Sequence, residues 1–514
     1  MKLAAIDIGT NSIHMVIAQA THKHSFQIID REKRMVKLGE GVFATNRLNE
    51  RAFREGLETI KRYVQLADQR GADEIITAAT SATREARNGG EFLNKVVKET
   101  GISPEVISGG REARLIFQAV RHEIDIHDEN VMVIDIGGGS TEITVGNKNE
   151  VLLAKSMKLG VLRLLDMFDG QGPISVEARG VLEAHIRFVA QQIFAEAKEI
   201  GFSRIIGTSG TIRTLGEAAH VAAGGKSMKS VNAEVVKVKN LEELTGQLLK
   251  LKPDKRASLD SIGDKRSDAI HLGGVLLLQL LKMAEVEELT LCDASLREGL
   301  ILDYLESHAQ KIDTFPEQED LRHRSVAQLA HEFDADWDQN IHVARLALQI
   351  FDQTAELHQM NTFEREILEF AAFLHSVGQY IRFKRYHKHG RYIIAHAGLR
   401  GFNDEEVKLI SQVARYHRKA VPKKKHKKFK KLSKEQRRTV QVLSAILRVA
   451  LGLDRTKNQL VNHINCKISK KKLVIQLAGQ PESLELELWA AQKNLGPLAK
   501  VLDRKIKLEP VAGS

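Results

Sequence analysis

An aspartate at the end of an apolar run, followed by a turn rich in glycine, serine and threonine, occurs twice in this chain of 514 residues. Asp7 stands in the first copy, AAIDIGTNS, and Asp135 stands 128 positions later in the second, VIDIGGGSTE. Apolar runs on both sides of each turn predict antiparallel strands. Glycine lets the backbone approach an anion closely, amide and hydroxyl groups donate to the anion, and the aspartate can hold a divalent cation beside it. The two copies therefore predict two facing turns that grip a chain of phosphates.

These turns do not match the other common phosphate-binding motifs. The run from Gly137 to Gly139 is followed neither by the GK[ST] of a P-loop nor by the helix of a dinucleotide-binding fingerprint, because the next segment reads as a strand. A lone glycine-rich hairpin is more often structural than functional. Its duplication, with aspartate in register both times, favours phosphate binding.

A candidate general base follows a third small-residue turn. Glu112 stands just after Ser108 and two glycines at the start of a predicted helix, so we expect its carboxylate to point toward the cleft between the two turns. Glutamate in a first helical turn is also favoured by the helix dipole alone, which is the structural alternative. Arg84 follows another small-residue turn and is able to bind a phosphoryl oxygen bidentately, although a surface arginine is the simpler interpretation.

Several segments together resemble one enzyme family, the exopolyphosphatase and guanosine pentaphosphate phosphatase family of the actin, hexokinase and heat-shock-chaperone superfamily. The segments that carry the resemblance are IDIGTNS with the following IHMVIA, ATSATREA, SGGREARLIF, IDIGGGSTE, GTSGTIRTL and DASLREGL. The resemblance continues through HAGLRGFNDEE and ARYHRKA, so it covers nearly the whole chain.

The resemblance implies an α/β fold with two ribonuclease-H-like lobes of the actin/hexokinase type. An all-helical HD-like domain and a small α+β domain are expected to follow. We place the four parts at residues 1–124, 125–308, 314–460 and 461–514. Alternating predicted strands and helices support the two lobes, and helical stripes begin near Thr314. Short alternating runs at 463–468, 472–477 and 484–488 predict strands in the last part.

The family's catalytic glutamate lies in the EAR motif that corresponds to Glu112, which strengthens the base assignment. We expect Mg²⁺ or Mn²⁺ as the cofactor, held by Asp135 and Glu142 with Asp7 as a further contact, although Asp135 capping its own turn is the structural alternative. Arg84 is assigned to catalysis beside Glu112. The residues expected to bind phosphate are Asn11, Ser12, Gly137, Gly138, Gly139, Ser140, Thr141, Thr208, Ser209 and Gly210.

The helical part resembles the HD-type phosphohydrolase fold but departs from it at one ligand. His342, His375 and Asp454 fall where that fold holds its metal, whereas the aspartate of the defining His-Asp pair is replaced here by Ser376. Loss of this carboxylate removes a hard oxygen ligand. We therefore expect the domain to be catalytically silent and to serve in binding.

The positive charge is concentrated in one segment. The formal net charge of the chain is +11, and residues 415–438 alone hold 13 Lys and Arg against one Glu. A solvated loop is the simplest interpretation. Because only Tyr416 and Phe429 supply aromatic rings there, we expect no nucleic acid and instead a polyphosphate path. Its residues would be Lys423, Lys424, Lys425, Lys427, Lys428, Lys430 and Lys431.

These features lead us to expect hydrolysis of terminal phosphates from inorganic polyphosphate, with guanosine pentaphosphate as the alternative substrate. An ATP-dependent kinase is a remoter alternative, because the GTSGT loop and Arg297 resemble the adenosine-binding region of kinase relatives. A non-catalytic protein that binds polyphosphate as a regulator is a further alternative. No run of about 20 apolar residues and no basic leader is present. We expect a cytoplasmic homodimer with at most peripheral membrane association.

Overall fold

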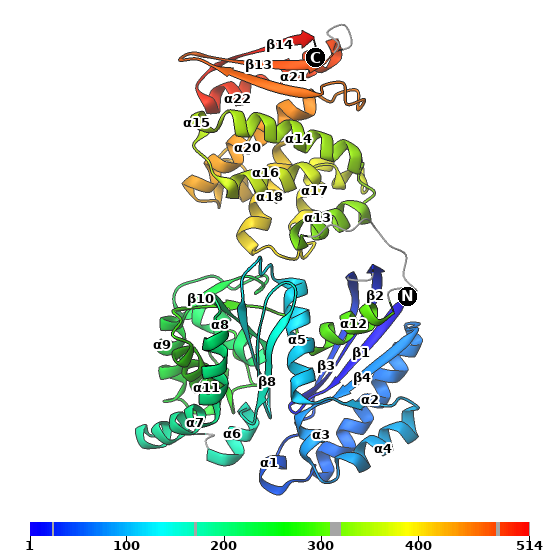
Figure 1. Cartoon of the computed structure of the whole chain (residues 1–514), viewed down its shortest axis with the longest axis vertical. Helices are drawn as coiled ribbons and strands as arrows, with labels where there is room; N and C mark the ends of the chain where they lie inside the picture. The colour runs from blue at the N-terminus through cyan, green and yellow to red at the C-terminus, as the bar shows by residue number, and fades with distance from the viewer. Residues whose placement is uncertain (23–24, 169–171, 309–319, 480–483, 513–514) are drawn as a thin grey trace. The chain divides into compact units, whose positions relative to one another are not determined.

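The computed structural model describes residues 1–22, 25–168, 172–308, 320–479 and 484–512. The chain divides into two compact units, Met1–Glu317 and Gln318–Ser514 (Figure 1). The first unit holds two α/β lobes, and the second holds a helical bundle with a small α+β part. The fold class expected from the sequence is confirmed.

The first lobe is built on a five-stranded sheet in the order β3-β2-β1-β4-β5. Alternate residues of β1 face opposite sides, as a strand requires. Ala4 and Ile6 pack with helices α2 and α4, whereas Leu3 and Ala5 pack with α5 and α12. The elements are β1 (Lys2–Ile8), β2 (Ser12–His22), β3 (Ser25–Met35), α1 (Val42–Thr45), α2 (Glu50–Gln69), β4 (Glu74–Ala79), α3 (Ser81–Glu85), α4 (Gly89–Thr100), β5 (Glu105–Val106), α5 (Gly109–Glu123) and α12 (Leu296–Ser307).

The second lobe repeats the scheme on a six-stranded sheet in the order β10-β11-β9-β6-β7-β8. In both lobes a strand pairs antiparallel with its hairpin partner and parallel with a later strand: β1 with β2 and β4, β6 with β7 and β9. The elements are β6 (Val131–Ile136), β7 (Thr141–Gly146), β8 (Val151–Met157), α6 (Val161–Phe168), α7 (Val176–Ile200), β9 (Arg204–Thr208), α8 (Ser209–Ala222), β10 (Val235–Lys237), α9 (Val238–Leu248), α10 (Pro253–Ala257), α11 (Ile270–Ala284) and β11 (Glu288–Leu291).

Helix α5 joins the two lobes. One hydrophobic cluster contains Leu3 of β1, Phe117 of α5 and Val133 of β6, so a single core is shared by both sheets and by this helix. The packing fixes α5, and with it Glu112, relative to the two hairpins.

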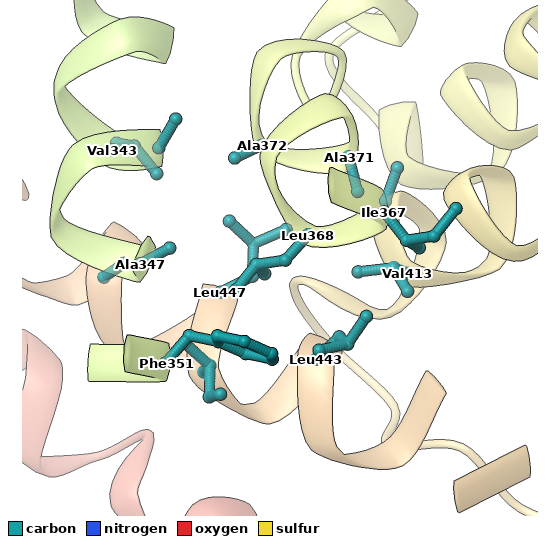
Figure 2. Packing of buried hydrophobic residues seen from close by; sticks show 14 of the residues in the cluster. Val343, Ala347, Phe351, Ile367, Leu368, Ala371, Ala372, Val413, Leu443 and Leu447 are labelled. Carbon is teal, nitrogen blue, oxygen red and sulfur yellow. The ribbon is translucent and has the colours of Figure 1, made fainter. Parts of the chain in front are cut away.

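The bundle of the second unit has a core of buried aliphatic and aromatic side chains (Figure 2). Val343, Ala347 and Phe351 follow one another at spacings of four on α14, which places them on the same face of the helix toward Leu368 and Leu447. The elements are α13 (Leu321–Glu332), α14 (Trp337–Gln353), α15 (Ala355–His358), α16 (Thr362–Phe373), η2 (Val377–Gln379), α17 (Tyr386–Ile394), α18 (Asp404–Tyr416), α19 (Lys427–Lys430) and α20 (Lys434–Gly452).

The α+β part packs into the same core and differs from expectation in one element. Its sheet has the order β12-β13-β14, formed by β12 (His463–Ile468), β13 (Lys472–Gly479) and β14 (Lys505–Ala512). The strand predicted at 484–488 is wrong, because Glu485–Gln492 is helix α21, followed by α22 (Leu495–Leu502). Leu484, Leu488 and Ala491 recur at helical spacing, and Leu484 and Ala491 are fully buried.

None of the described helices is both long enough and apolar enough to cross a bilayer.

Candidate active site

The two hairpin turns face each other, as their duplication predicts. A Cβ atom built on Gly138 would lie only 3.1 Å from Cβ of Thr10 and 3.4 Å from Cβ of Asn11. The turn of the second lobe thus touches the turn of the first, and a side chain in place of Gly138 would be packed unusually tightly there.

Helix α6 orients the peptide groups of the second turn. The carbonyl groups of Gly137 and Gly138 accept hydrogen bonds from the backbone N–H groups of Val161 and Leu162, at 3.1 and 2.8 Å. Arg163 donates through Nε to the Gly139 carbonyl at 2.7 Å. Because N–H and C=O point in opposite directions across a trans peptide, the N–H groups that follow these carbonyls point away from α6. This is the orientation that an anion in the adjoining cavity needs.

One cavity lies between the two turns and collects most of the predicted site. The predicted residues that line it are Asp7, Asn11, Ser12, Glu112, Asp135, Gly137, Gly138, Gly139, Ser140, Glu142, Ser209 and Gly210. Segments from both lobes therefore meet there, although they are separated by up to about 200 positions in the chain.

Three of the predicted residues do not line this cavity. The Thr141 hydroxyl is buried and donates to the Leu159 carbonyl at 2.6 Å, and the Thr208 hydroxyl donates to the Ala294 carbonyl. Both hydroxyls hold neighbouring loops in place. Arg84 lies behind Glu112, where its Nη1 donates to the Ile107 carbonyl at 2.6 Å and lies 3.4 Å from Glu112 Oε2. It is placed to orient the glutamate.

Glu112 reaches the cavity because its helix begins close to the second sheet. The Ser108 hydroxyl caps α5 by accepting from the Arg111 N–H at 3.2 Å. A Cβ atom on Gly109 would lie 2.3 Å from Ser156 Cβ of β8, so only glycine lets the helix start this close to the sheet. Ser156 in turn donates to Glu142 at 2.7 Å. The first turn of α5 thereby brings Glu112 next to the carboxylates of the second hairpin.

Four carboxyl groups line this cavity with raised pKa values; Glu112, Asp135 and Glu142 are buried and Asp7 is half-buried. Burial, and then repulsion from Glu142, raise the pKa values of Glu112 and Asp135 well above their ordinary values. Burial raises the pKa of Glu142 to about 7, against the opposing hydrogen bond from Ser156. Burial and repulsion from Glu298 raise the pKa of Asp7 to about 6, although Arg297 acts in the opposite direction. Perturbed carboxyl groups gathered in a cleft are typical of active sites.

The cavity also has a basic wall that the sequence did not predict. Lys33, Arg213, Arg266 and Arg297 line it together with His14. Burial, followed by repulsion from Arg266, lowers the pKa of Lys33 to about 8; burial, followed by repulsion from Arg213, lowers that of Arg266 to about 10. A polyanion in the cavity would relieve this repulsion. Arg213 and Arg297 lie in the quoted motifs GTSGTIRTL and DASLREGL, whereas no local pattern marks Lys33 and Arg266.

The donor set fits a hard cation such as Mg²⁺. Asp7 Oδ1 and Asn11 Oδ1 are buried without a hydrogen-bond partner, and carboxylate and amide oxygens are the ligands that such a cation prefers. The described residues hold no group of three or more His, Cys, Asp or Glu side chains suited to a metal ion. Mg²⁺ does not require such a group, because it usually binds one or two carboxylates and completes its coordination shell with water and substrate oxygens.

We expect the cation-free protein to lose stability as the pH rises. Folding raises the pKa of Asp7 from its ordinary value of 3.8 to about 6. It raises the pKa of Glu142 from 4.5 to about 7. The folded state therefore binds more protons, so its stability is fully present below pH 4 and falls as the pH rises toward 7. Thermal unfolding of the first unit in EDTA should show a Tm roughly 5 °C lower at pH 7.5 than at pH 5. Added Mg²⁺ should remove most of the difference, and a pH-independent Tm would contradict the mutual repulsion.

In the helical part of the second unit, residue 376 belongs to a hydrogen-bond network of the core. Ser376 is buried and accepts a hydrogen bond from Asn340 at 2.9 Å, while Asn340 also donates to the Phe373 carbonyl at 2.8 Å. His342 Nε2 and Asp454 Oδ2 are buried without hydrogen-bond partners. In the described part of the chain neither belongs to a group able to hold a metal ion. The serine thus completes a core hydrogen-bond network in place of a metal ligand.

The lysine-rich segment of the second unit is anchored to the bundle. Phe429 and Leu432 are buried, and the Tyr416 hydroxyl lies 2.8 Å from His426 Nδ1. The buried Arg448 donates to the carbonyl groups of Tyr416, Lys419 and Ala420 at 2.7 to 3.0 Å. The seven lysines of the predicted path are all exposed on this scaffold, Lys423, Lys424, Lys425, Lys427, Lys428, Lys430 and Lys431.

The chain was compared with known proteins. The model of the Ppx/GppA phosphatase family matches residues 16–308, and the model of Ppx/GppA phosphatase domain III matches residues 321–493. A guanosine-5'-triphosphate,3'-diphosphate pyrophosphatase of Aeromonas hydrophila is 29% identical over 409 residues, which is 79% of either chain.

Two solved structures resemble the fold. A Cytophaga hutchinsonii exopolyphosphatase has a TM-score of 0.56 and 28% identity, and it covers 60% of this chain and 98% of its own. A Ppx/GppA family member of Aquifex aeolicus has a TM-score of 0.52 and 28% identity, over 60% of this chain and 98% of its own. With the family model matching more than half of its residues, the chain belongs to the Ppx/GppA phosphatase family.

Proposed function

We propose that this phosphoanhydride hydrolase removes terminal phosphates from inorganic polyphosphate, with Glu112 as the general base and with Mg²⁺ or Mn²⁺ as its cofactor. The observation that carries the proposal is the position of Glu112, which lines the same cavity as the two facing turns, the carboxylates and the basic wall. Phosphoryl transfer needs positioning, charge neutralisation and an oriented water, and this cavity has a candidate group for each requirement.

Each group in the cavity has a role that follows from its chemistry. The amide groups of Gly138 and Gly139 and the Ser140 hydroxyl hold the terminal phosphate, and the cations of the basic wall hold the phosphates that follow. Glu112 accepts the proton of the attacking water, for which a pKa raised toward the operating pH is suited. A bound divalent cation, held by Asp135 and Glu142 with Asp7 as a further contact, would neutralise charge on the phosphate oxygens.

Guanosine pentaphosphate is the second candidate substrate. The Aeromonas hydrophila relative, which is named for this nucleotide, aligns with 79% of the chain. Its chemistry is the same, the loss of a terminal phosphate, and the cations of the basic wall would suit the additional phosphates of either substrate. The lysine-rich segment favours polyphosphate, since a compact nucleotide has few phosphates to contact.

The kinase and regulator alternatives are less well supported. Arg213, Arg266 and Arg297 line the part of the cavity formed by the GTSGT loop. Guanidinium groups suit phosphate oxygens better than a neutral adenine ring. A purely binding protein would have no need for Glu112 among the carboxylates. Orthophosphate release, measured in parallel from long polyphosphate, guanosine pentaphosphate and ATP, tests all of these assignments.

The exposed lysines give a separate prediction about chain length. We expect that changing Lys424, Lys425, Lys427 and Lys428 to Gln raises the KM for long polyphosphate roughly tenfold and flattens its salt dependence, because fewer counterions are released on binding. Since these lysines contact substrate remote from the reacting bond, kcat and the hydrolysis of guanosine pentaphosphate should stay near wild-type values.

A matched control variant removes the same amount of charge from another part of the second unit. It changes Lys470, Lys471, Lys472 and Lys500 to Gln, all of which are exposed. The control should retain the wild-type KM and salt slope. Equal behaviour of the two variants would remove the segment as the reason to prefer polyphosphate.

A further inference from the structure

The second unit exposes an aromatic cluster beside its basic residues. Tyr380, Phe383 and Tyr392 are 65%, 71% and 59% exposed, far more than such rings usually are in a folded domain. They lie on and just before α17, which packs against α18, the helix that leads into the lysine-rich segment. We call residues 380–392 together with Arg415 and Arg418 the aromatic-basic face.

The cluster is continuous with the basic segment through Arg418. The Arg418 guanidinium lies 5.6 Å from the ring centroid of Phe383 and 4.5 Å from that of Tyr386. Tyr386 in turn places its hydroxyl 3.1 Å from His417 Nε2, which fixes the ring against the end of α18. Phe383 therefore has a cation over one face of its ring and most of its surface open to solvent.

The stretch of sequence that carries these rings has charged residues of one sign only. Between Glu369 and Asp404 the sequence contains no acidic residue. The exposed cations that alternate with the rings are Arg382, Lys384, Arg385 and Lys388, and Arg391 follows at the next turn of α17. Burial, followed by repulsion from Arg415, lowers the pKa values of His387 and Arg391, so charges of α18 act on α17 across the helix contact.

Rings open to solvent and interleaved with cations match the chemistry of one kind of polyanion. A phosphate chain without bases gains nothing from a ring, whereas each base of a single strand stacks on an aromatic side chain and its backbone pairs with Lys or Arg. We propose that the aromatic-basic face binds single-stranded nucleic acid, with a base stacked on Phe383 beside Arg418. Our expectation of no nucleic acid rested on the few rings within residues 415–438, and the fold brings further rings to that segment from residues 380–392.

The test uses the full chain and a fluorescein-labelled single-stranded oligouridine of about 12 nucleotides, with binding followed by fluorescence anisotropy at low salt. We expect Phe383→Ala to weaken this binding roughly tenfold, the effect of losing one stacked base, and Phe383→Trp to retain it. Binding of polyphosphate and orthophosphate release should be unchanged in both variants. Oligothymidine in a parallel series shows whether the strand preferred is RNA or DNA.

Phe188→Ala is the matched control, since Phe188 is 74% exposed on α7 of the first unit. This variant should bind the oligonucleotide like the wild type. The proposal is overturned if the wild type binds neither strand, or if Phe383→Ala binds oligouridine as tightly as the wild type, because charge alone then explains the affinity. Equal weakening of polyphosphate and oligouridine binding by Phe383→Ala would also overturn it, since the ring would then only maintain the surface.

Discussion

Glu112→Gln lowers kcat by roughly 10²–10⁴-fold, the usual contribution of a general base. The substitution keeps the size of the side chain and removes only its ability to accept a proton. The Ser108 cap and the packing of α5 do not involve the carboxylate, so the fold and KM should stay close to those of the wild type. Steady-state phosphate release across a pH series gives the measurement, and the acidic limb of the wild-type profile should disappear in the variant.

Two controls separate proton transfer from structure. Glu105→Gln changes an exposed glutamate just ahead of the same helix and should leave kcat unchanged. Arg84→Lys should shift the acidic limb rather than abolish turnover, because Arg84 contacts Glu112 and does not line the cavity. Near-normal turnover in Glu112→Gln would eliminate this residue as the base.

Asp135→Ala lowers activity by roughly 10²–10³-fold at a fixed, low Mg²⁺ concentration, because a divalent cation offsets several kcal/mol of charge in the transition state. Part of the loss should be recovered at high Mg²⁺, since Glu142 and the substrate oxygens remain as ligands. The matched control is Asp128→Ala, an exposed carboxylate of the same lobe whose side chain is 86% exposed.

A direct binding measurement makes this prediction independent of turnover. Calorimetric titration with Mn²⁺ should give a weaker Kd for Asp135→Ala than for the wild type. The same variant should be more stable than the wild type in EDTA at pH 7.5, because one of four mutually repelling carboxylates is gone. Full activity of the wild type in excess EDTA would contradict a cation-dependent site.

The sequence predicted the parts of the site that local patterns encode. The strand, acidic residue and small-residue turn around Asp7 and Asp135 follow from alternating burial and turn chemistry. The prediction that the turns face each other came from their duplication. Thr141 and Thr208 were predicted to bind phosphate because they lie close to a turn in the sequence. Their hydroxyl groups instead donate to backbone carbonyl groups and do not reach the cavity.

The basic wall was beyond sequence reasoning for a physical reason. Lys33, Arg213 and Arg266 come from a strand, a helix and a loop with no shared spacing, and only the tertiary fold brings them together. The helix at 485–492 was missed because a run of five residues contains too few positions to separate a period of 2 from one of 3.6. In both cases the deciding information lies in contacts between distant segments.

Helix α5 has a consequence for the timing of each reaction cycle. It packs on β7 and β8 of the second sheet and shares its core with β1 of the first, so it bridges the two lobes. Any opening that releases orthophosphate must move Glu112 relative to at least one of the two turns. With Glu112 as the proposed base, water would then be activated only while the lobes are closed. Lobe closure and proton transfer would then form a single gated event, in which product leaves only when hydrolysis is switched off.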